Sequence, residues 1–450
     1  MRRLLENLFL SIYCQQNTTL VRSIAFLVVL TVIGFYFFIV EHFTVNIPFQ
    51  DDFAFLFFSN KLLEAESFQQ KFYLFLNFHN EHRIAFPRLI IYLLLKQFSM
   101  VNFKTAIFFG NAFLIGLLAV IYKLNSKGQS KHLVLVICSF LLFQLQHWEN
   151  SSWALAGLSN FCGVFFAGIA FYYLNRSDWI GFIFSFVFAV LALSANGGGL
   201  LVFFTIGLFY ILTKNIKFFI PWFIVSSVIV TLYFIGYVKP ENHPGIFEAL
   251  QHPLRFTLYF ISFLGGSFSA DNHYLAPLAP MGGITALMFF GYLTWKKYYL
   301  NNPGVYCFLL FILFVAASAA VTRSGFGLHQ AFSSRYKIFS TVYLILSFLA
   351  VMNLFYEEKK EIKAKIIGYF AIFALVFNLS SFPRNLYLLE VHTKKTVFHM
   401  RNWVMKNEGV NIDAKNIDDP IMTKSLKNRV YQFSCAEVPI RKQDQAKWCE

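Results

Sequence analysis

The sequence predicts an all-α polytopic membrane protein, and three observations support this fold class. First, 57% of the 450 residues are hydrophobic and only 14% are charged, which is more apolar surface than a water-soluble fold can hide. Second, apolar runs of about 20 residues recur from Arg22 to Pro383 between short polar breaks. Third, the short alternating segments of a membrane β-barrel do not occur. We therefore expect a bundle of membrane-spanning helices.

About eleven spans fit this pattern, beginning with residues 22–41. The others are expected at 103–122, 132–147, 153–174, 179–195, 200–213, 218–238, 281–295, 303–322, 336–355 and 366–383. The chain then divides into an N-terminal segment (1–21), a membrane domain (22–383) and a polar C-terminal tail (384–450). Because segment 1–21 lacks a clean small-residue cleavage site, we expect it to be retained on the cytoplasmic side.

Basic residues predict the orientation, because cytoplasmic loops are enriched in Lys and Arg. With the N-terminus inside and the C-terminus outside, most loop cations face the cytoplasm, for example Lys131 and Lys296. The net charge of +15 is then explained by the basic residues that set the membrane topology, and it does not predict a nucleic-acid partner. Two further apolar stretches, 83–98 and 255–268, are short. If either one crossed the membrane by itself, every later loop would change sides and the basic loops would face outward. We expect both to be interfacial or re-entrant outer helices, the first within the outer loop 42–102.

The cysteines fall into two groups. Cys14, Cys138, Cys162 and Cys307 lie in or near apolar runs, where free thiols pack as small hydrophobic groups. The other two lie in the polar tail, and a disulfide between them is plausible if the tail faces an oxidising compartment; they are Cys435 and Cys449.

The unusual polar segments all emerge on the outer side in this topology. They are FQDDFAF (49–55), FHNEHRIAFPRL (78–89), QHWENSSWALAG (146–157), SANGGGLL (194–201), SADNHY (269–274) and RSGFGLHQAFSSRY (323–336). An ionisable group at membrane depth costs at least about 2–3 kcal/mol, so several of them at one face predict a functional site.

The acidic pair Asp51 and Asp52 follows Pro48 and admits two interpretations. As a helix N-terminus, the carboxylates would cap free backbone N–H groups and complement the helix dipole. Alternatively, one of them is a general base that accepts a proton from a hydroxyl outside the bilayer. Adjacent residues on a helix point about 100° apart, so we expect the pair to divide these roles.

The HNEHR motif also has two interpretations. On a helix, His79 and His82 would share one face and form half of a metal site, but no companion ligand cluster appears and no metal is predicted. The alternative is a hydrogen-bonded network, in which Glu81 pairs with Arg83 and positions the aspartates, with Asn80 among its members.

The segment 323–336 predicts a phosphate site. Arg323, His329 and Arg335 surround small residues, and guanidinium forks fit phosphate oxygens, while Tyr336 adds a hydroxyl or an aromatic face. The alternative is an interfacial belt of Arg and aromatic residues.

Two further motifs complete the candidate site. Trp148, Glu149 and Asn150 suit a carbohydrate subsite through stacking and paired hydroxyl contacts, although Trp is also a common interface anchor. Asn196 precedes three glycines, either facing a cavity between two half-spans or simply shaping a loop. Walker A, GxGxxG, HExxH and GxSxG motifs do not occur, so nucleotide-driven transport and nicotinamide chemistry have no support.

Taken in this order, the motifs resemble the GT-C superfamily of integral membrane glycosyltransferases over residues 20–385. The resemblance implies a polyprenyl-phosphate sugar donor, loaded from membrane lipid, with Asp51 and Asp52 at the catalytic base and Arg335 and Tyr336 at the donor phosphate. It also implies transfer, with inversion, to a glycan or lipid acceptor of the envelope, such as O-antigen, lipopolysaccharide or another polysaccharide. The site would face the periplasm of the bacterial inner membrane. Phe53 stands where the family leads us to expect Trp.

Other classes remain open at this point. A lipid or solute transporter would also place polar groups inside a helical bundle, although transporters usually show repeat symmetry and a route to both sides. Another lipid-linked transferase of envelope biogenesis would fit the same face.

Overall fold

The computed structural model describes residues 2–125, 130–239, 249, 251–269, 276–406, 409–410 and 415–439. Within this part, eight helices are long and apolar enough to cross a membrane. They are α2 (Thr19–Phe43), α6 (Phe103–Leu124), α9 (Ala154–Tyr173), α12 (Ile216–Phe234), α15 (Leu278–Trp295), α16 (Pro303–Arg323), α17 (Lys337–Leu354) and α18 (Lys360–Lys406). The prediction of an all-α polytopic membrane protein is confirmed.

Several shorter helices complete the membrane domain. Three of them coincide with predicted spans, namely α7 (Lys131–Leu142), α10 (Trp179–Ala195) and α11 (Leu200–Leu212), and α14 (Pro253–Leu264) occupies the stretch expected to be interfacial. Each predicted span therefore contains a helix, but these three are shorter than the 18 residues that define the longer set. The count of eleven spans and the orientation stay predictions.

The last predicted span is different from the helix that the structure contains. The sequence prediction ends it at residue 383, where the apolar run gives way to the polar tail. In the structure Pro383 lies inside α18, which continues without a break to Lys406. The tail 384–450 therefore begins as a continuation of the last helix.

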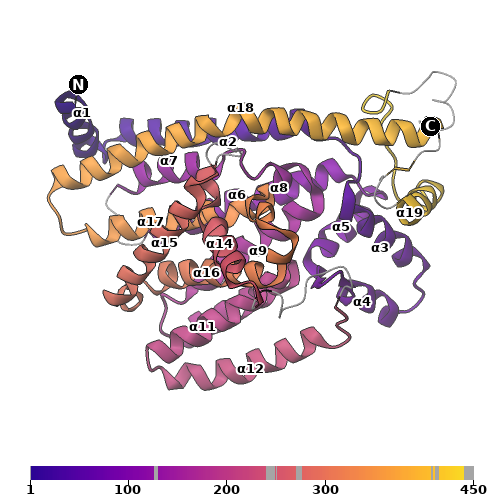
Figure 1. Cartoon of the computed structure of the whole chain (residues 1–450), viewed down its shortest axis with the longest axis horizontal. Coiled ribbons are helices and arrows are strands. Elements are labelled where there is room, and N and C mark those ends of the chain that lie inside the picture. The colour runs from indigo at the N-terminus through magenta and orange to yellow at the C-terminus, as the bar shows by residue number, and fades with distance from the viewer. Residues whose placement is uncertain are drawn as a thin grey trace.

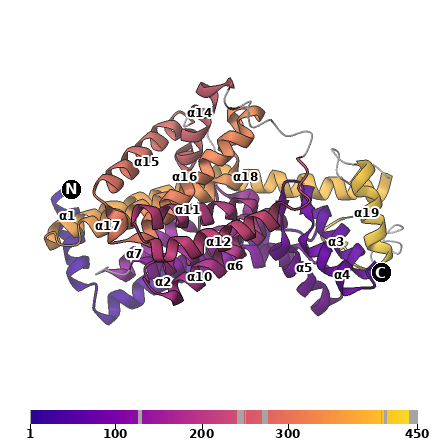
Figure 2. The same cartoon turned by 90° about the horizontal axis from the view of Figure 1, so that it is seen from below.

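The helices are arranged lengthwise in an elongated bundle. Figure 1 shows α18 running along the long axis of the molecule beside α2, with the N-terminal helix α1 (Arg2–Gln15) near one end. At the opposite end lie α3 (Phe53–Glu64), α4 (Phe68–Leu76), α5 (Ala85–Phe98) and α19 (Lys415–Lys427). We call these the α1 end and the α3 end. Figure 2 shows α14 and α15 projecting from the side of the bundle.

Helix α9 lies at the centre of the core. It packs against α6, α10 and α16, and 78% of its apolar window is buried inside the protein. Its small residues allow close approach: a Cβ on Gly157 would lie 2.5 Å from the Asn150 carbonyl oxygen. Because α9 begins at the α3 end, its first turns can carry polar residues into the site described below.

Short elements connect the long helices. Between α2 and α6 they are the 3-10 helix η1 (Gln50–Asp52), α3, α4, the strands β1 (Phe78–His79) and β2 (His82–Arg83), and α5. Further along are α8 (Trp148–Ser152), η2 (Gly197–Gly199), η3 (Gly266–Ser269), η5 (Tyr298–Leu300), η6 (Ser324–Phe326), η7 (Leu328–Phe332) and η8 (Ser334–Tyr336).

Asn46 connects the first loop to the C-terminal tail. Its amide nitrogen donates to the carbonyl oxygen of Gln432 (2.9 Å), and its amide oxygen accepts from the backbone N–H of Phe103 (2.8 Å). Its backbone N–H donates to Glu437 Oε2 (3.0 Å), and its carbonyl accepts from the Tyr431 hydroxyl (2.6 Å). The described part of the tail is therefore docked onto the α3 end.

The cysteines agree in part with the expectation from the sequence. The four cysteines of the apolar runs are free thiols, whereas Cys435 in the tail is disulfide-bonded. Cys449 lies outside the described residues.

Substitution of Asn46 tests whether the tail docking contributes to stability. Asn46→Ala removes two side-chain hydrogen bonds and leaves buried partners unsatisfied, so we expect the free energy of unfolding to fall by about 2–4 kcal/mol. Thermal or denaturant unfolding of the purified protein in detergent measures this. The exposed Asn301→Ala is the matched control and should change stability by less than about 0.5 kcal/mol. Equal effects of the two substitutions would contradict the prediction.

Candidate functional site

A polar cavity of about 250 Å³ lies at the α3 end of the bundle. Segments that are far apart in the sequence meet there, from η1, the β1–β2 hairpin, the start of α9, the end of α10, the end of α16 and η8. The lining residues are Asp51, His79, Asn80, Glu81, His82, Ile84, Trp153, Leu155, Ala156, Ser159, Asn160, Asn196, Arg323, Arg335 and Tyr336. The structure thus brings together most of the residues that the sequence singled out.

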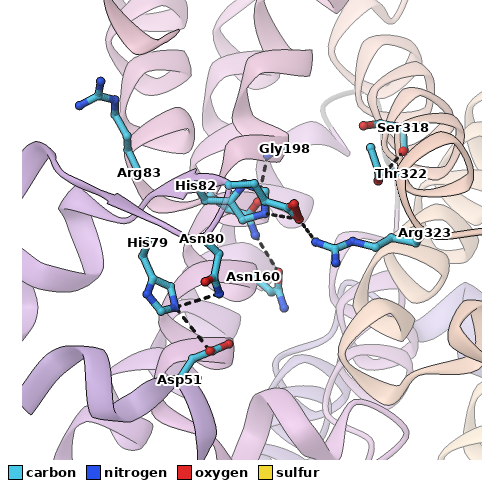
Figure 3. A network of polar contacts seen from close by, with 12 residues as sticks. Asp51, His79, Asn80, His82, Arg83, Asn160, Gly198, Ser318, Thr322 and Arg323 are labelled. Atoms are coloured by element: carbon cyan, nitrogen blue, oxygen red, sulfur yellow. Dashed lines mark hydrogen bonds and ion pairs between the residues drawn. The ribbon is translucent and has the colours of Figure 1, made fainter. Parts of the chain in front are cut away.

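Asp51 points into this cavity. Figure 3 shows its carboxylate directed at His79 and Asn80, and His79 Nε2 lies 3.5 Å from Asp51 Oδ1. Burial alone would raise the pKa of Asp51, but the hydrogen bond and charge of His79, with Arg335 and Asn80, outweigh it and lower the pKa. Asp51 is therefore an ionised carboxylate at neutral pH.

Asp52 is turned away from the cavity and is only 1% exposed. Its Oδ1 accepts a hydrogen bond from the backbone N–H of Leu155 (2.8 Å), and its Oδ2 accepts from that of Phe49 (3.2 Å). Burial raises the pKa of Asp52 to about 8 in spite of these bonds. Asp52 thus fastens η1 to the start of α9 and leaves Asp51 as the carboxylate of the pair that faces the cavity.

The HNEHR motif forms a hairpin and not a helix, so the prediction of a shared helical face for its histidines is wrong. Strands β1 and β2 pair antiparallel, with His79 opposite His82, and Asn80 takes a positive φ of 50° in the turn. Asn tolerates this left-handed conformation better than most residues, which favours the turn. No group of metal ligands occurs among the residues that the structure describes.

The expected pair of Glu81 with Arg83 is also wrong. Glu81 forms an ion pair with Arg323 from the end of α16. Arg83 is directed away from His82 and Arg323 in Figure 3, and it donates its guanidinium hydrogens to backbone carbonyls, including that of Tyr233 at 2.8 Å. Its guanidinium lies 4.3 Å from the centre of the Phe78 ring. Arg83 therefore fixes the hairpin to the end of α12, because backbone carbonyls there need donors.

Glu149 holds the loop that carries Arg335. Its Oε2 accepts hydrogen bonds from Ser333 Oγ (3.0 Å), Ser334 Oγ (2.8 Å) and the Arg335 backbone N–H (3.1 Å). The guanidinium of Arg335 lies over Trp153, at 5.7 Å, and its buried Nε has no hydrogen-bond partner among the described residues. The loop thus presents the Arg335 guanidinium to the cavity, while the Nε atom itself is enclosed by protein.

A chain of amides supports the same wall. Asn196 Nδ2 donates to Asn160 Oδ1 (3.0 Å), Asn160 Nδ2 donates to Asn150 Oδ1 (2.8 Å), and Asn150 Nδ2 donates to the Arg335 carbonyl (2.9 Å). Asn160 was not predicted as a site residue, although an isolated Asn within the apolar run 153–174 was a signal for it. Gly197 follows this chain, and a Cβ there would lie 2.3 Å from His82 Nδ1.

Some predicted residues do not line the cavity. His329 is exposed on η7, and the Trp148 ring lies 5.5 Å from that of His392 on α18. Glu149 and Asn150 form hydrogen bonds with the loop at 333–335, as described above, and do not line the cavity. Of the SADNHY segment, residues 270–274 lie outside the described residues.

The polar cavity continues into an apolar groove of about 420 Å³. The two share Glu81, His82, Asn160, Asn196, Arg323 and Tyr336. The rest of the groove is formed mainly by apolar side chains of α11, α12, α14 and α16, among them Leu201, Phe204, Val230, Phe263, Val315 and Ala319. A cationic polar cavity joined to an apolar groove suits a ligand with an anionic head and a hydrocarbon chain.

Comparisons of the chain with protein-family models, curated proteins and solved structures found no match. The resemblance to GT-C glycosyltransferases therefore rests on the sequence motifs, and a functional proposal has to rest on the site itself.

The elevated pKa of Asp52 predicts a pH-dependent stability. In the unfolded chain Asp52 ionises near its ordinary pKa of 3.8, whereas in the folded protein it keeps its proton up to about pH 8. Folding binds a proton between these values, so the contribution of Asp52 to stability falls as the pH rises through this window. Asp52→Asn lacks this titration. The unfolding temperature of the wild type, relative to Asp52→Asn, should therefore decrease from about pH 5 to about pH 8. A constant difference would contradict the assignment.

Proposed function

We propose that the protein is a membrane glycosyltransferase that transfers a sugar from a polyprenyl-phosphate donor to a glycan or lipid acceptor of the cell envelope. One observation carries the proposal: a single polar cavity contains the Asp51 carboxylate and the Arg323 and Arg335 guanidiniums, and it opens into an apolar groove. The required donor has the same division into an anionic head and a hydrocarbon chain.

The donor would bind across the junction of the cavity and the groove. Its prenyl chain would lie between α11, α12 and α16, and its phosphate would meet the guanidinium of Arg335, which lines the cavity. Arg323, fixed by Glu81, adds a second cation at the junction. Tyr336 lines both spaces and can contact either the phosphate or the sugar.

The proposed reaction is a single displacement. The acceptor hydroxyl attacks the anomeric carbon and loses its proton to the Asp51 carboxylate, while the bond from that carbon to the phosphate oxygen breaks. Attack opposite the leaving group inverts the anomeric centre. Polyprenyl phosphate departs with an additional negative charge, and preorganised guanidiniums stabilise that charge more in the transition state than in the ground state. His79 contacts Asp51 and holds its orientation.

The periplasmic face of a bacterial inner membrane is the proposed location. Of the 26 Lys and Arg residues before the tail (1–383), 15 lie in the segments expected on the cytoplasmic side, which is the asymmetry that a cytoplasmic face shows. The disulfide-bonded Cys435 belongs to the tail docked at the α3 end, and disulfides persist in oxidising compartments such as the periplasm. Both observations support placing the candidate site outside.

Substitution of Asp51 tests the proposed base. Asp51→Asn keeps the shape but cannot accept the proton, so we expect sugar transfer to fall by about 10²–10⁴-fold with little change in stability. The assay follows radiolabel from a panel of polyprenyl-phosphate hexoses and pentoses into the envelope fraction of membranes. Asp52→Asn makes the same change at a carboxylate that does not reach the cavity; because Asp52 fastens η1 to α9, it should lower transfer, but by much less than Asp51→Asn does. Full activity of Asp51→Asn would exclude this residue as the base.

Filling the groove tests the donor assignment. Ala319 lines the apolar groove on α16, and Ala319→Phe should obstruct a long prenyl chain. We expect a KM at least about tenfold higher for donors of full prenyl length, with a smaller change for short-chain donors that leave the groove empty. Ala317→Phe makes the same change on the same helix outside the groove lining. Equal effects on long and short donors would show that the chain binds elsewhere.

A further inference from the structure

A second polar cavity, of about 400 Å³, lies at the α1 end of the bundle. Its cationic lining comes from Arg22 at the start of α2, Lys131 at the start of α7 and Lys360 at the start of α18. Helix α2, with 25 residues, separates this end from the candidate site by about 37 Å at 1.5 Å per residue. The cavity is therefore independent of the site described above.

The positive charge of this cavity has no carboxylate partner among the residues that the structure describes. No carboxylate is among its lining residues. Arg22, Lys131 and Lys360 form no ion pair within the part of the chain that the structure describes, and the Lys131 ammonium lies 5.7 Å from the centre of the Tyr122 ring. Neighbouring Lys365, by contrast, is paired with Glu6 at 3.0 Å. Three cations converging without a counter-ion favour the binding of an anion.

The walls also contain buried polar atoms that lack partners. Tyr13 is 2% exposed, Gln16 is 7% exposed and Ser130 is 6% exposed. The Tyr13 hydroxyl, Gln16 Oε1 and Ser130 Oγ form no hydrogen bond with any described residue. An unsatisfied buried polar atom costs about 1–3 kcal/mol. The three residues line the cavity, so a shift of their side chains on binding would give these atoms a partner in the ligand.

We infer that this cavity binds a phosphate group carried by a larger molecule. A phosphate offers several acceptor oxygens, which match a guanidinium fork, two ammonium groups and two hydroxyls better than the two oxygens of a carboxylate do. The volume exceeds that of a bare phosphate, so the group has room for a substituent. The substituent is either the rest of a lipid headgroup or the rest of a soluble phosphate compound.

The position of the cavity predicts what binding would do. Helix α1 forms one wall, and it packs on α18 through the Phe9 and Tyr369 rings, whose centres are 5.7 Å apart. A phosphate held between Tyr13 on α1, Arg22 on α2 and Lys360 on α18 would join three helices at this end. Binding should therefore stabilise the docking of α1.

Binding to a charge-reduced variant tests the inference. The double variant Arg22→Gln with Lys360→Gln removes two lining cations, and Lys123→Gln with Lys359→Gln removes two cations outside the lining. The full chain in neutral detergent is titrated with pyrophosphate or with dioleoyl phosphatidylglycerol and examined by native mass spectrometry. We expect at least one probe to bind the wild type and the control, and to bind the lining variant about tenfold more weakly or worse.

The two probes separate the possible sources. Loss of pyrophosphate binding alone identifies a soluble phosphate, and loss of phosphatidylglycerol binding alone identifies a lipid headgroup. The uncharged variant Tyr13→Phe with Ser130→Ala removes two buried hydroxyls and should also weaken binding, which covers the case in which the lining variant does not fold. Absence of binding by both probes, or equal loss in the lining and control variants, would overturn the inference.

Discussion

The candidate site depends on one constraint: polar groups at the ends of membrane helices must find partners inside the protein, because lipid supplies none. At the α3 end these partners come from distant segments. Asp52 satisfies the backbone N–H of Leu155 at the start of α9, and Glu149 satisfies three donors of the loop at 333–335. Each of these bonds joins segments more than 100 positions apart in the sequence. The walls of the cavity are fixed relative to one another for this reason.

Because of this constraint, some polar groups of the site are occupied by hydrogen bonds within the protein, whereas others remain able to contact a ligand. The two carboxylates of the acidic pair have different surroundings: Asp52 is fully engaged by backbone donors, while Asp51 is partly exposed and contacts His79. Likewise the Glu149 carboxylate accepts hydrogen bonds from the loop at 333–335, while the Arg335 side chain that this loop carries lines the cavity. The buried members hold the geometry so that the available members can act on a ligand. Preorganisation of this kind is what charge stabilisation in a transition state requires.

The sequence predicted the positions of the helices well, because apolar runs are a strong and local signal. It also identified most of the cavity residues, since polar side chains between apolar runs are rare. It did not predict the hairpin at 78–83, because six residues are too few to distinguish helical from extended periodicity. The partners of Glu149 and Arg323 could not be predicted for another reason: they lie 184 or more positions away in the sequence. Beyond Pro383, helix α18 buries Leu389, Met400 and Trp403, and tertiary contacts of this kind can override a local helix-breaking signal.

The distribution of polar groups along α9 bears on the choice between two functions, transport of a polar solute across the membrane and a reaction at one membrane face. Ser159 and Asn160 line the polar cavity, within the first two turns of this central helix. From residue 161 to residue 171 the helix contributes only apolar side chains and glycines to the core. A transported polar solute would have to pass this stretch, where no side chain of α9 can replace its water. A transferase that loads its donor sideways from the bilayer needs no such passage, and the groove beside α11 and α12 meets the cavity before the apolar stretch begins. The arrangement therefore favours chemistry at one face over movement between two.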